Sequence, residues 1–255
     1  MCLKEKLYFP PPYEYLFKNT QPGLEFNGGS VYSDLTNEDE MKDADKRKLV
    51  LILFFGSIWG LSEAVFGGLL YAAEIKWASI YLGAWALFLL AMARSMFNIP
   101  GTSTAIGAVA AVFRMVNAGL FICHLGGIFI LAAAFDIAAG LILKKSFSEK
   151  RAGLFRVSGT VGTGILSAYL SNGFFALIFT FIIRYEYWAA GGWPKVFDHT
   201  FVLGSLLALA AGVCVTLGWR IGESSRKVAL LKPSFAPRFI LALSVGFWII
   251  GRLVG

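Results

Sequence analysis

Residues 49–71 read LVLILFFGSIWGLSEAVFGGLLY and decide the class of fold. The stretch is long enough to cross the hydrocarbon core of a bilayer as one helix, which takes about 20 residues. It holds a single charged residue, Glu63. Similar apolar blocks follow at residues 78–93, 104–119, 123–143, 157–183, 201–219 and 239–254. The sequence therefore predicts an all-α, polytopic transmembrane bundle with six or seven spanning helices.

The composition agrees with a membrane protein. Of the 255 residues, 57% are hydrophobic and only 15% are charged, which leaves too little polar surface for a soluble domain of this size. The formal net charge is +7. The basic residues stand beside the apolar blocks, which is typical of membrane topology and argues against a nucleic acid partner. We expect membrane lipid to surround the chain.

The placement of lysine and arginine predicts the orientation. With a cytoplasmic amino terminus, most basic residues flank the cytoplasmic ends of the helices: Lys46, Arg47, Lys48, Arg94, Lys144, Lys145, Lys150, Arg151, Arg156, Arg220, Arg226, Lys227, Lys232 and Arg238. Only Lys76, Arg184, Lys195 and Arg252 fall at the outer ends. We therefore predict a polar cytoplasmic tail over residues 1–48, partly extended or disordered, and a multi-pass domain over residues 49–255 in the cell (inner or plasma) membrane.

Charged residues inside the apolar blocks indicate where function lies. A charged side chain at bilayer depth costs about 2.5 to 3.5 kcal/mol on insertion scales. Glu63 lies roughly 21 Å and Arg114 roughly 15 to 18 Å from the cytoplasmic end of their helices, and Asp136 is lower, at roughly 12 Å. Most of the polar groups share the outer half of the bilayer, which predicts a polar pocket open to the outside.

The predicted substrate-binding residues are those polar and aromatic groups at the outer level: Glu63, Arg114, Asn117, His124, Tyr169, Asn172 and Trp59. The alternative for Glu63 and Arg114 is a buried pair that only fixes helix register. His124 is either an interfacial residue or a ligand. Asp136 is expected to hydrogen-bond a neighbouring helix, and a role in proton or cation movement is the alternative.

Residues 184–200 read RYEYWAAGGWPKVFDHT and form a long aromatic outer loop. One interpretation is an interfacial anchor, because aromatic rings favour the membrane surface. The other is a lid over the pocket, hinged near Gly191 and Gly192.

No cofactor or metal site is indicated. The sequence has no HExxH zinc motif, no GxSxG elbow and no P-loop, so the chain does not supply ATP hydrolysis in the usual way. Cys2, Cys123 and Cys214 share no metal-type spacing and predict no disulfide framework.

Small residues recur every four positions in the first and third blocks. Gly56, Gly60 and Ala64 share one helix face, and Gly107 and Ala111 share another. Such stripes let helix backbones approach closely in lipid. They serve either packing within the chain or contact with a partner membrane protein.

These features resemble the substrate-binding S components of energy-coupling-factor transporters, which import vitamins and metal ions. The segments that carry the resemblance are GSIWGLSEAVFGG at residues 56–68 and PGTSTAIGAVAAVF at residues 100–113, within a comparison over roughly residues 49–219. The resemblance implies that Gly56, Gly60, Ala64, Gly107 and Ala111 contact a transmembrane coupling subunit, which works with an ATPase partner. It also implies a small-molecule substrate near the outer face, bound by residues such as Glu63, Arg114, Asn117, Tyr169 and Asn172.

Three functions follow as hypotheses. The first is a substrate-binding subunit of a transporter for a small polar solute. The second is an integral membrane enzyme for lipid-type substrates, with His124, Asp136 and His199 as candidate groups, although these three lie at different predicted levels. The third is a structural subunit of a larger membrane complex.

Overall fold

The computed structural model describes residues 30–117, 121–148, 154–229 and 236–254, with side chains for residues 45–96, 98–117, 121–143, 157–225 and 238–253. The chain divides into two units, Met1–Asp43 and Ala44–Gly255. The contacts given below all lie within the second unit.

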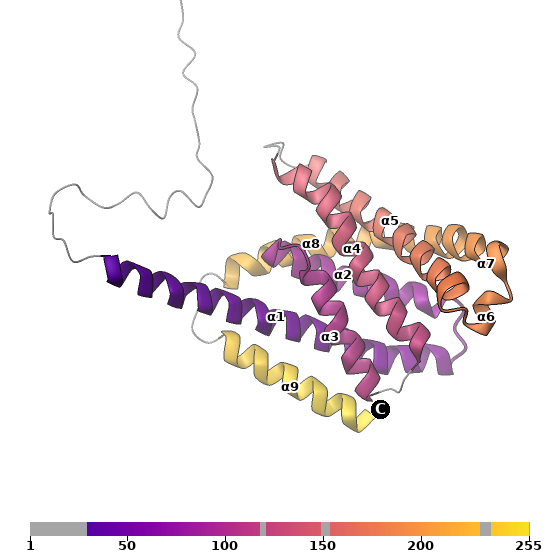
Figure 1. Ribbon diagram of the computed structural model, residues 1–255, viewed down its shortest axis with the longest axis horizontal. Coiled ribbons are helices and arrows are strands. Elements are labelled where there is room, and N and C mark those ends of the chain that lie inside the picture. The colour runs from indigo at the N-terminus through magenta and orange to yellow at the C-terminus, as the bar shows by residue number, and fades with distance from the viewer. Residues whose placement is uncertain (1–29, 118–120, 149–153, 230–235, 255) are drawn as a thin grey trace, which may run out of the picture. The chain divides into compact units, whose positions relative to one another are not determined.

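The described residues form helices and contain no strand, as Figure 1 shows. In chain order the elements are α1 (Ser30–Ala72), α2 (Ala78–Phe97), α3 (Thr102–Asn117), α4 (Ile122–Ser148), α5 (Leu154–Leu177), the π-helix η2 (Ile178–Ile182), α6 (Glu186–Ala189), α7 (Gly192–Asp198), the π-helix η3 (His199–Leu203), α8 (Gly204–Ala229) and α9 (Ala236–Val254). The predicted all-α bundle is confirmed.

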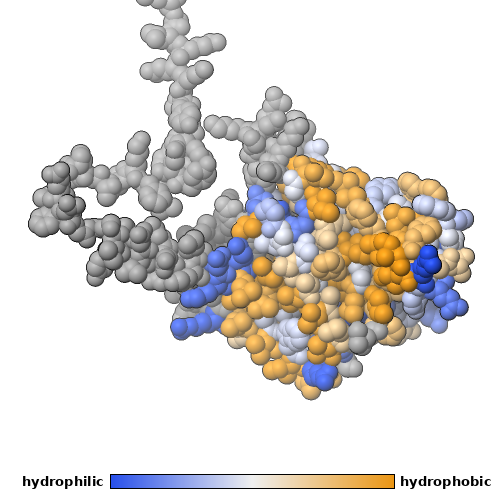
Figure 2. All heavy atoms as spheres, in the orientation of Figure 1, coloured by the Kyte–Doolittle hydropathy of each residue, from blue (hydrophilic) through white to orange (hydrophobic). Residues whose placement is uncertain are grey.

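Five helical segments in the described residues are long and apolar enough to cross a membrane: Asp45–Ala72, Ala78–Met96, Ile122–Leu143, Val157–Ile182 and Gly192–Ser225. Their outward faces are apolar, and Figure 2 shows hydrophobic residues over most of the visible face. Side chains such as Leu209 and Ile182 are 76% and 74% exposed. Exposed apolar area on this scale is typical of a surface that faces lipid, and the chain is a multi-pass membrane protein.

The start of the first helix differs from the prediction. We expected it at Leu49, after a tail that is partly extended or disordered, but α1 begins at Ser30. Residues 38–48 read EDEMKDADKRK, which is rich in strong helix formers, and Glu38 precedes Lys42 by one turn. The helix therefore begins in a polar sequence that precedes its apolar stretch. Residues 1–29 of the predicted tail lie outside the described residues.

Small residues bring the helices of the bundle together. A Cβ atom placed on Gly56 would lie 2.5 Å from Cβ of Val109, and one placed on Gly60 would lie 2.5 Å from Cβ of Phe113, so α1 and α3 touch backbone to side chain. Gly107 in the same way faces Ala132 of α4 and the ring of Trp59.

These contacts correct the expectation of a partner-facing stripe. Gly56, Gly60 and Gly107 are buried against the chain's own helices, because close approach of α1, α3 and α4 needs positions without side chains. Ala64 and Ala111 are half-buried, and Ala111 packs on the central apolar core.

The core fills the space between these helices. Its largest fully enclosed side chains include Trp59, Phe135, Leu87 and Trp219. On the α2–α8 contact, Gly218 faces the carbonyl of Phe88. The cavity described below lies toward one end of the bundle, beyond this tight centre.

The seventh apolar segment, α9, runs beside α1 and α3 in the same direction as α1 (Figure 1). The rings of Phe247 and Phe54 are 6.0 Å apart, and Nε1 of Trp248 donates to Oγ of Ser57 at 3.0 Å. One turn later Arg252 donates to the carbonyl of Val116 at 2.8 Å, near the end of α3. The segment is therefore packed lengthwise on the bundle.

Asp136 joins α4 to the turn between α2 and α3. One carboxylate oxygen accepts from Arg94 at 2.8 Å and from the main-chain N–H of Gly101 at 3.1 Å. The other accepts from the main-chain N–H and the hydroxyl of Thr104, both at 2.9 Å. Asp136 thus caps α3 and neutralises a buried arginine, as expected for a group that hydrogen-bonds a neighbouring helix. Arg94, which the sequence suggested as a flanking topology residue, is only 3% exposed.

Candidate functional site: a polar-ended cavity at one end of the bundle

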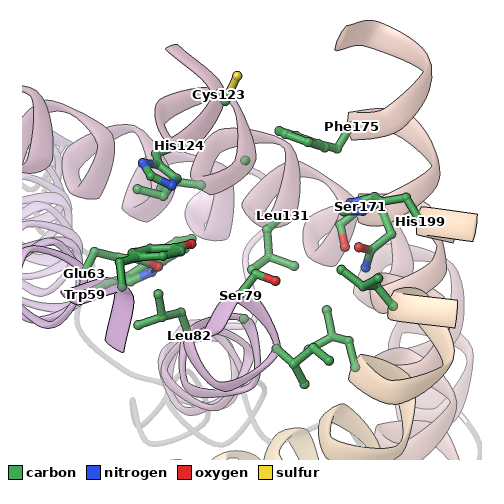
Figure 3. Close-up of a pocket in the computed structure, with 18 residues that line it drawn as sticks. Trp59, Glu63, Ser79, Leu82, Cys123, His124, Leu131, Ser171, Phe175 and His199 are labelled. Carbon is green, nitrogen blue, oxygen red and sulfur yellow. Dashed lines mark hydrogen bonds between the residues drawn. The ribbon is translucent and has the colours of Figure 1, made fainter. Parts of the chain in front are cut away.

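A cavity of about 160 Å³ opens among α1, α2, α4, α5, η3 and α8. Its walls come from the ends of α1 and α5 and from the beginnings of α2, α4 and α8, so it lies at the end of the bundle that the sequence predicts to be outer. Figure 3 shows its lining side chains: Trp59, Glu63, Tyr71, Ser79, Ile80, Leu82, Gly83, Cys123, His124, Gly127, Ile128, Leu131, Ser171, Asn172, Phe175, His199, Leu203 and Leu207.

Glu63 and Arg114 do come together, as the sequence suggested, but not as a tight ion pair. Nη1 of Arg114 lies 4.0 Å from Oε2 of Glu63 and donates to the main-chain carbonyl of Glu63 at 2.5 Å. Oε1 of Glu63 accepts from Nε1 of Trp59 at 3.3 Å, one turn earlier on α1. The arginine therefore holds the backbone of α1 and leaves part of the carboxylate open to the cavity.

His124 lies beside this pair on α4. Its Nδ1 is 3.4 Å from Nη2 of Arg114. Because a guanidinium only donates, Nδ1 accepts and the ring proton of a neutral His124 is on Nε2. The ring also packs 5.3 Å from the ring of Tyr71, near the end of α1. These contacts make His124 part of the cavity wall.

The opposite end of the cavity is formed by α5 and η3, where Figure 3 shows Ser171, Phe175 and His199. His199 packs 5.6 Å from Phe175 and 4.8 Å from Trp188 between ring centres. Asn172 donates through Nδ2 to the carbonyl of Ala168 at 2.8 Å, so its amide oxygen remains as an acceptor. Between the two polar ends, Leu82 and Leu131 give the cavity a mainly apolar middle, in which Figure 3 also shows the side chain of Ser79.

The structure places three of the predicted site residues outside the cavity wall. Arg114 lies behind Glu63 and is only 6% exposed. Asn117 is buried, donates to the carbonyl of Phe113 at 2.8 Å and faces Gly251 of α9. The hydroxyl of Tyr169 pairs with that of Ser205 at 2.8 Å, in a groove between α5 and α8. Both side chains lie outside the cavity because α5 and α3 are rotated away from it at those positions, although Oδ1 of Asn117 is buried without a hydrogen-bond partner among the described residues.

The loop over residues 184–200 folds into α6, α7 and the start of η3. Trp188 and Val196 are buried in a small cluster with Phe179 of η2. Gly192 has φ of 52°, a backbone conformation that glycine adopts without strain. The loop thus packs as a folded cap on the end of α5 and presses Trp188 against a cavity residue.

Several cavity residues escaped the sequence analysis. Tyr71 lines the cavity on the same face of α1 as Trp59 and Glu63, at a spacing of four or eight residues, but is not among the predicted binding residues. The sequence suggests His199 only as a candidate catalytic group of a membrane enzyme, together with His124 and Asp136. In the structure both histidines of the chain line one cavity, whereas Asp136 is paired with Arg94, so the separation expected between the two histidines is corrected.

Among the described residues, no group of three or more His, Cys, Asp or Glu side chains is arranged to hold a metal ion. Cys123 and Cys214 are free thiols. Comparisons with protein families, with curated proteins and with solved structures gave no match to this chain. The geometry of the site is that of a partly open cavity with a carboxylate at one end, neutral polar groups at the other and mainly apolar walls between.

Proposed function

We propose that the chain is a membrane-embedded binding subunit for a small polar solute, which takes part in transport together with a separate energising partner. The observation that carries this proposal is the convergence of Glu63, His124, Asn172 and His199 on one cavity inside the bundle. An intramembrane charge costs free energy, so a carboxylate that opens on a cavity instead of closing a tight pair indicates a binding role.

The size of the cavity limits the solute. Pockets for drug-sized ligands commonly measure about 300 to 1,000 Å³. The cavity of about 160 Å³ suits a smaller molecule, or one that gains room by a shift of the α6–α7 cap. Apolar walls with a few convergent polar groups are the usual composition of a small-molecule site.

The energising partner is part of the proposal that rests on the resemblance of the sequence. The chain carries no P-loop, so ATP hydrolysis would come from another subunit, as in the energy-coupling-factor transporters that the sequence resembles. The docking surface of that partner is not the stripe of Gly56, Gly60 and Gly107, since contacts within the chain occupy it.

Filling the cavity tests the proposal. Gly127 lines the cavity, and a Cβ atom there would make only ordinary contact with Phe175, so Gly127→Leu folds and projects into the space. We expect native mass spectrometry of the full chain, released from membranes in mild detergent, to show a small bound solute on the unmodified protein. The Gly127→Leu variant should lose that mass.

Gly140→Leu is the matched control. It lies on the same helix, where a Cβ atom has no neighbour within 4 Å, and it should retain the solute. A solute that remains bound to Gly127→Leu, or one lost equally from both variants, contradicts binding in this cavity.

A further inference from the structure

The charge of the cavity wall comes from one residue. Glu63 is the only Asp, Glu, Lys or Arg among the described residues that line the cavity, and its side chain is 13% exposed. Oε1 of Glu63 accepts a hydrogen bond from Nε1 of Trp59. Oε2 accepts no hydrogen bond from the described residues, and Nη1 of Arg114 lies 4.0 Å away from it. A carboxylate oxygen in a charge-assisted bond to a nitrogen donor lies at about 2.7 to 2.9 Å instead. Oε2 is thus left with acceptor capacity.

Arg114 is not available to a ligand. It does not line the cavity, and its two terminal nitrogens donate to the carbonyl of Glu63 and to Nδ1 of His124. The pair is therefore polarised, with the carboxylate toward the cavity and the guanidinium on its far side. With no lysine or arginine in the described wall, the carboxylate group of an anion or a zwitterion would have no cationic partner there.

The remaining walls fit an amphiphilic molecule. Next to Glu63 stands the ring of Tyr71, which is 44% exposed, and the face of an aromatic ring attracts cations. The middle is mainly apolar, with the single hydroxyl of Ser79, and the far end offers the neutral polar groups of Asn172 and His199.

We propose, building on the function proposed above, that the solute is a small organic ammonium ion whose charged nitrogen binds Oε2 of Glu63 and whose apolar spacer ends in a hydroxyl or similar group at Asn172 and His199. The Glu63 carboxylate, the ring of Tyr71 beside it and the lack of a lysine or arginine among the described lining residues select a cation over a neutral or anionic molecule of the same size.

A matched set of probes tests this charge selection. The molecules 4-aminobutan-1-ol, butane-1,4-diol and 4-hydroxybutyrate share one chain and one hydroxyl and differ in charge at the other end. With their three- and five-carbon homologues, they are titrated by calorimetry into the purified full chain in detergent. We expect the amino alcohol to bind about tenfold to a hundredfold more tightly than the diol, the range that corresponds to a hydrogen bond with a charged group, and the hydroxy acid to bind most weakly.

Two variants assign the effect to Glu63. Glu63→Gln should remove the preference for the amine, whereas Glu74→Gln, the same change at an exposed position just beyond α1, should leave it intact. The ammonium proposal would be overturned if the diol or the hydroxy acid bound more tightly than the amino alcohol. The binding function would still stand if Gly127→Leu abolished that binding. No binding by any probe, or binding that neither Gly127→Leu nor Glu63→Gln alters, would overturn both.

Discussion

At the scale of single residues, the structure separates two intramembrane charge clusters with different geometry. Asp136 is saturated by donors at 2.8 to 3.1 Å from Arg94, Gly101 and Thr104. The carboxylate of Glu63 lies 4.0 Å from the guanidinium of Arg114 and lines a cavity. A saturated carboxylate holds structure, whereas one with spare acceptor capacity at a cavity wall is free to bind a ligand.

The first prediction concerns Arg114. In Arg114→Met, the Glu63 carbonyl and His124 lose their donor and a buried carboxylate loses its cation. We expect the free energy of unfolding to fall by about 3 to 5 kcal/mol, the range for removing one partner of a buried pair. Denaturant titration of the detergent-purified protein measures this loss.

The control for this prediction is Arg220→Met, because Arg220 is exposed on α8. Adding Glu63→Gln to Arg114→Met should recover part of the lost stability, because the uncompensated charge is then gone. Equal stability of the Arg114 and Arg220 variants would show that the buried arginine has no structural role.

At the scale of elements, residues spaced by four on α1 form two neighbouring faces of the helix, one made of glycines and one that lines the cavity. Gly56 and Gly60 let α3 approach, while Trp59, Glu63 and Tyr71 turn toward the cavity. The close α1–α3 contact therefore fixes the rotation of α1, and with it the direction of the Glu63 carboxylate.

The second prediction tests that contact. Gly60→Leu places a side chain where Phe113 already lies, 2.5 Å from the new Cβ, and should separate α1 from α3. We expect a loss of stability of about 1 to 3 kcal/mol or more from overpacking, seen as a lower melting temperature and less monodisperse protein in size-exclusion chromatography.

Gly68→Leu is the comparison on the same helix, since a Cβ atom there has no neighbour within 4 Å. It should behave like the unmodified chain. Equal effects of Gly60→Leu and Gly68→Leu would mean that α1 does not pack on α3 through this glycine.

At the scale of the whole molecule, α9 completes the bundle. Its contacts progress from Phe54 and Ser57 on α1 to Val116 at the end of α3, so its carboxyl end lies level with the cavity end of the bundle. The amino-terminal end of the spanning part of α1 lies at the opposite end, together with Asp136 and Arg94.

The third prediction is the topology that this arrangement implies. If the basic flanks set a cytoplasmic amino terminus, the carboxyl terminus lies on the outer side, together with the cavity. We expect a carboxyl-terminal alkaline phosphatase fusion to be active and the matching fluorescent-protein fusion to be dark, with the reverse pattern for fusions after residue 148. A fluorescent carboxyl-terminal fusion would show that α9 does not span.

The sequence by itself determined the long apolar helices, but not the short helices α6 and α7 within the predicted loop. Whether a block enters the membrane depends on the sum of transfer free energies of its residues, which is a local property, so the predicted starts at residues 78 and 123 fall within one residue of Ala78 and Ile122. Transfer free energies did not predict that α1 begins at Ser30. The stretch before Leu49 is polar, and its helical structure comes from the helix propensity of its residues. The sequence also indicated Glu63, Arg114 and Asp136 as the informative charges.

Only the tertiary structure decided which polar groups meet. The rotation of each helix about its axis depends on where small residues of distant segments touch, and this is not a local property. That rotation pairs Asp136 with Arg94, turns Tyr169 and Asn117 out of the cavity, and brings His199 into it opposite His124. The cavity exists because helices far apart in the chain present these faces to one another.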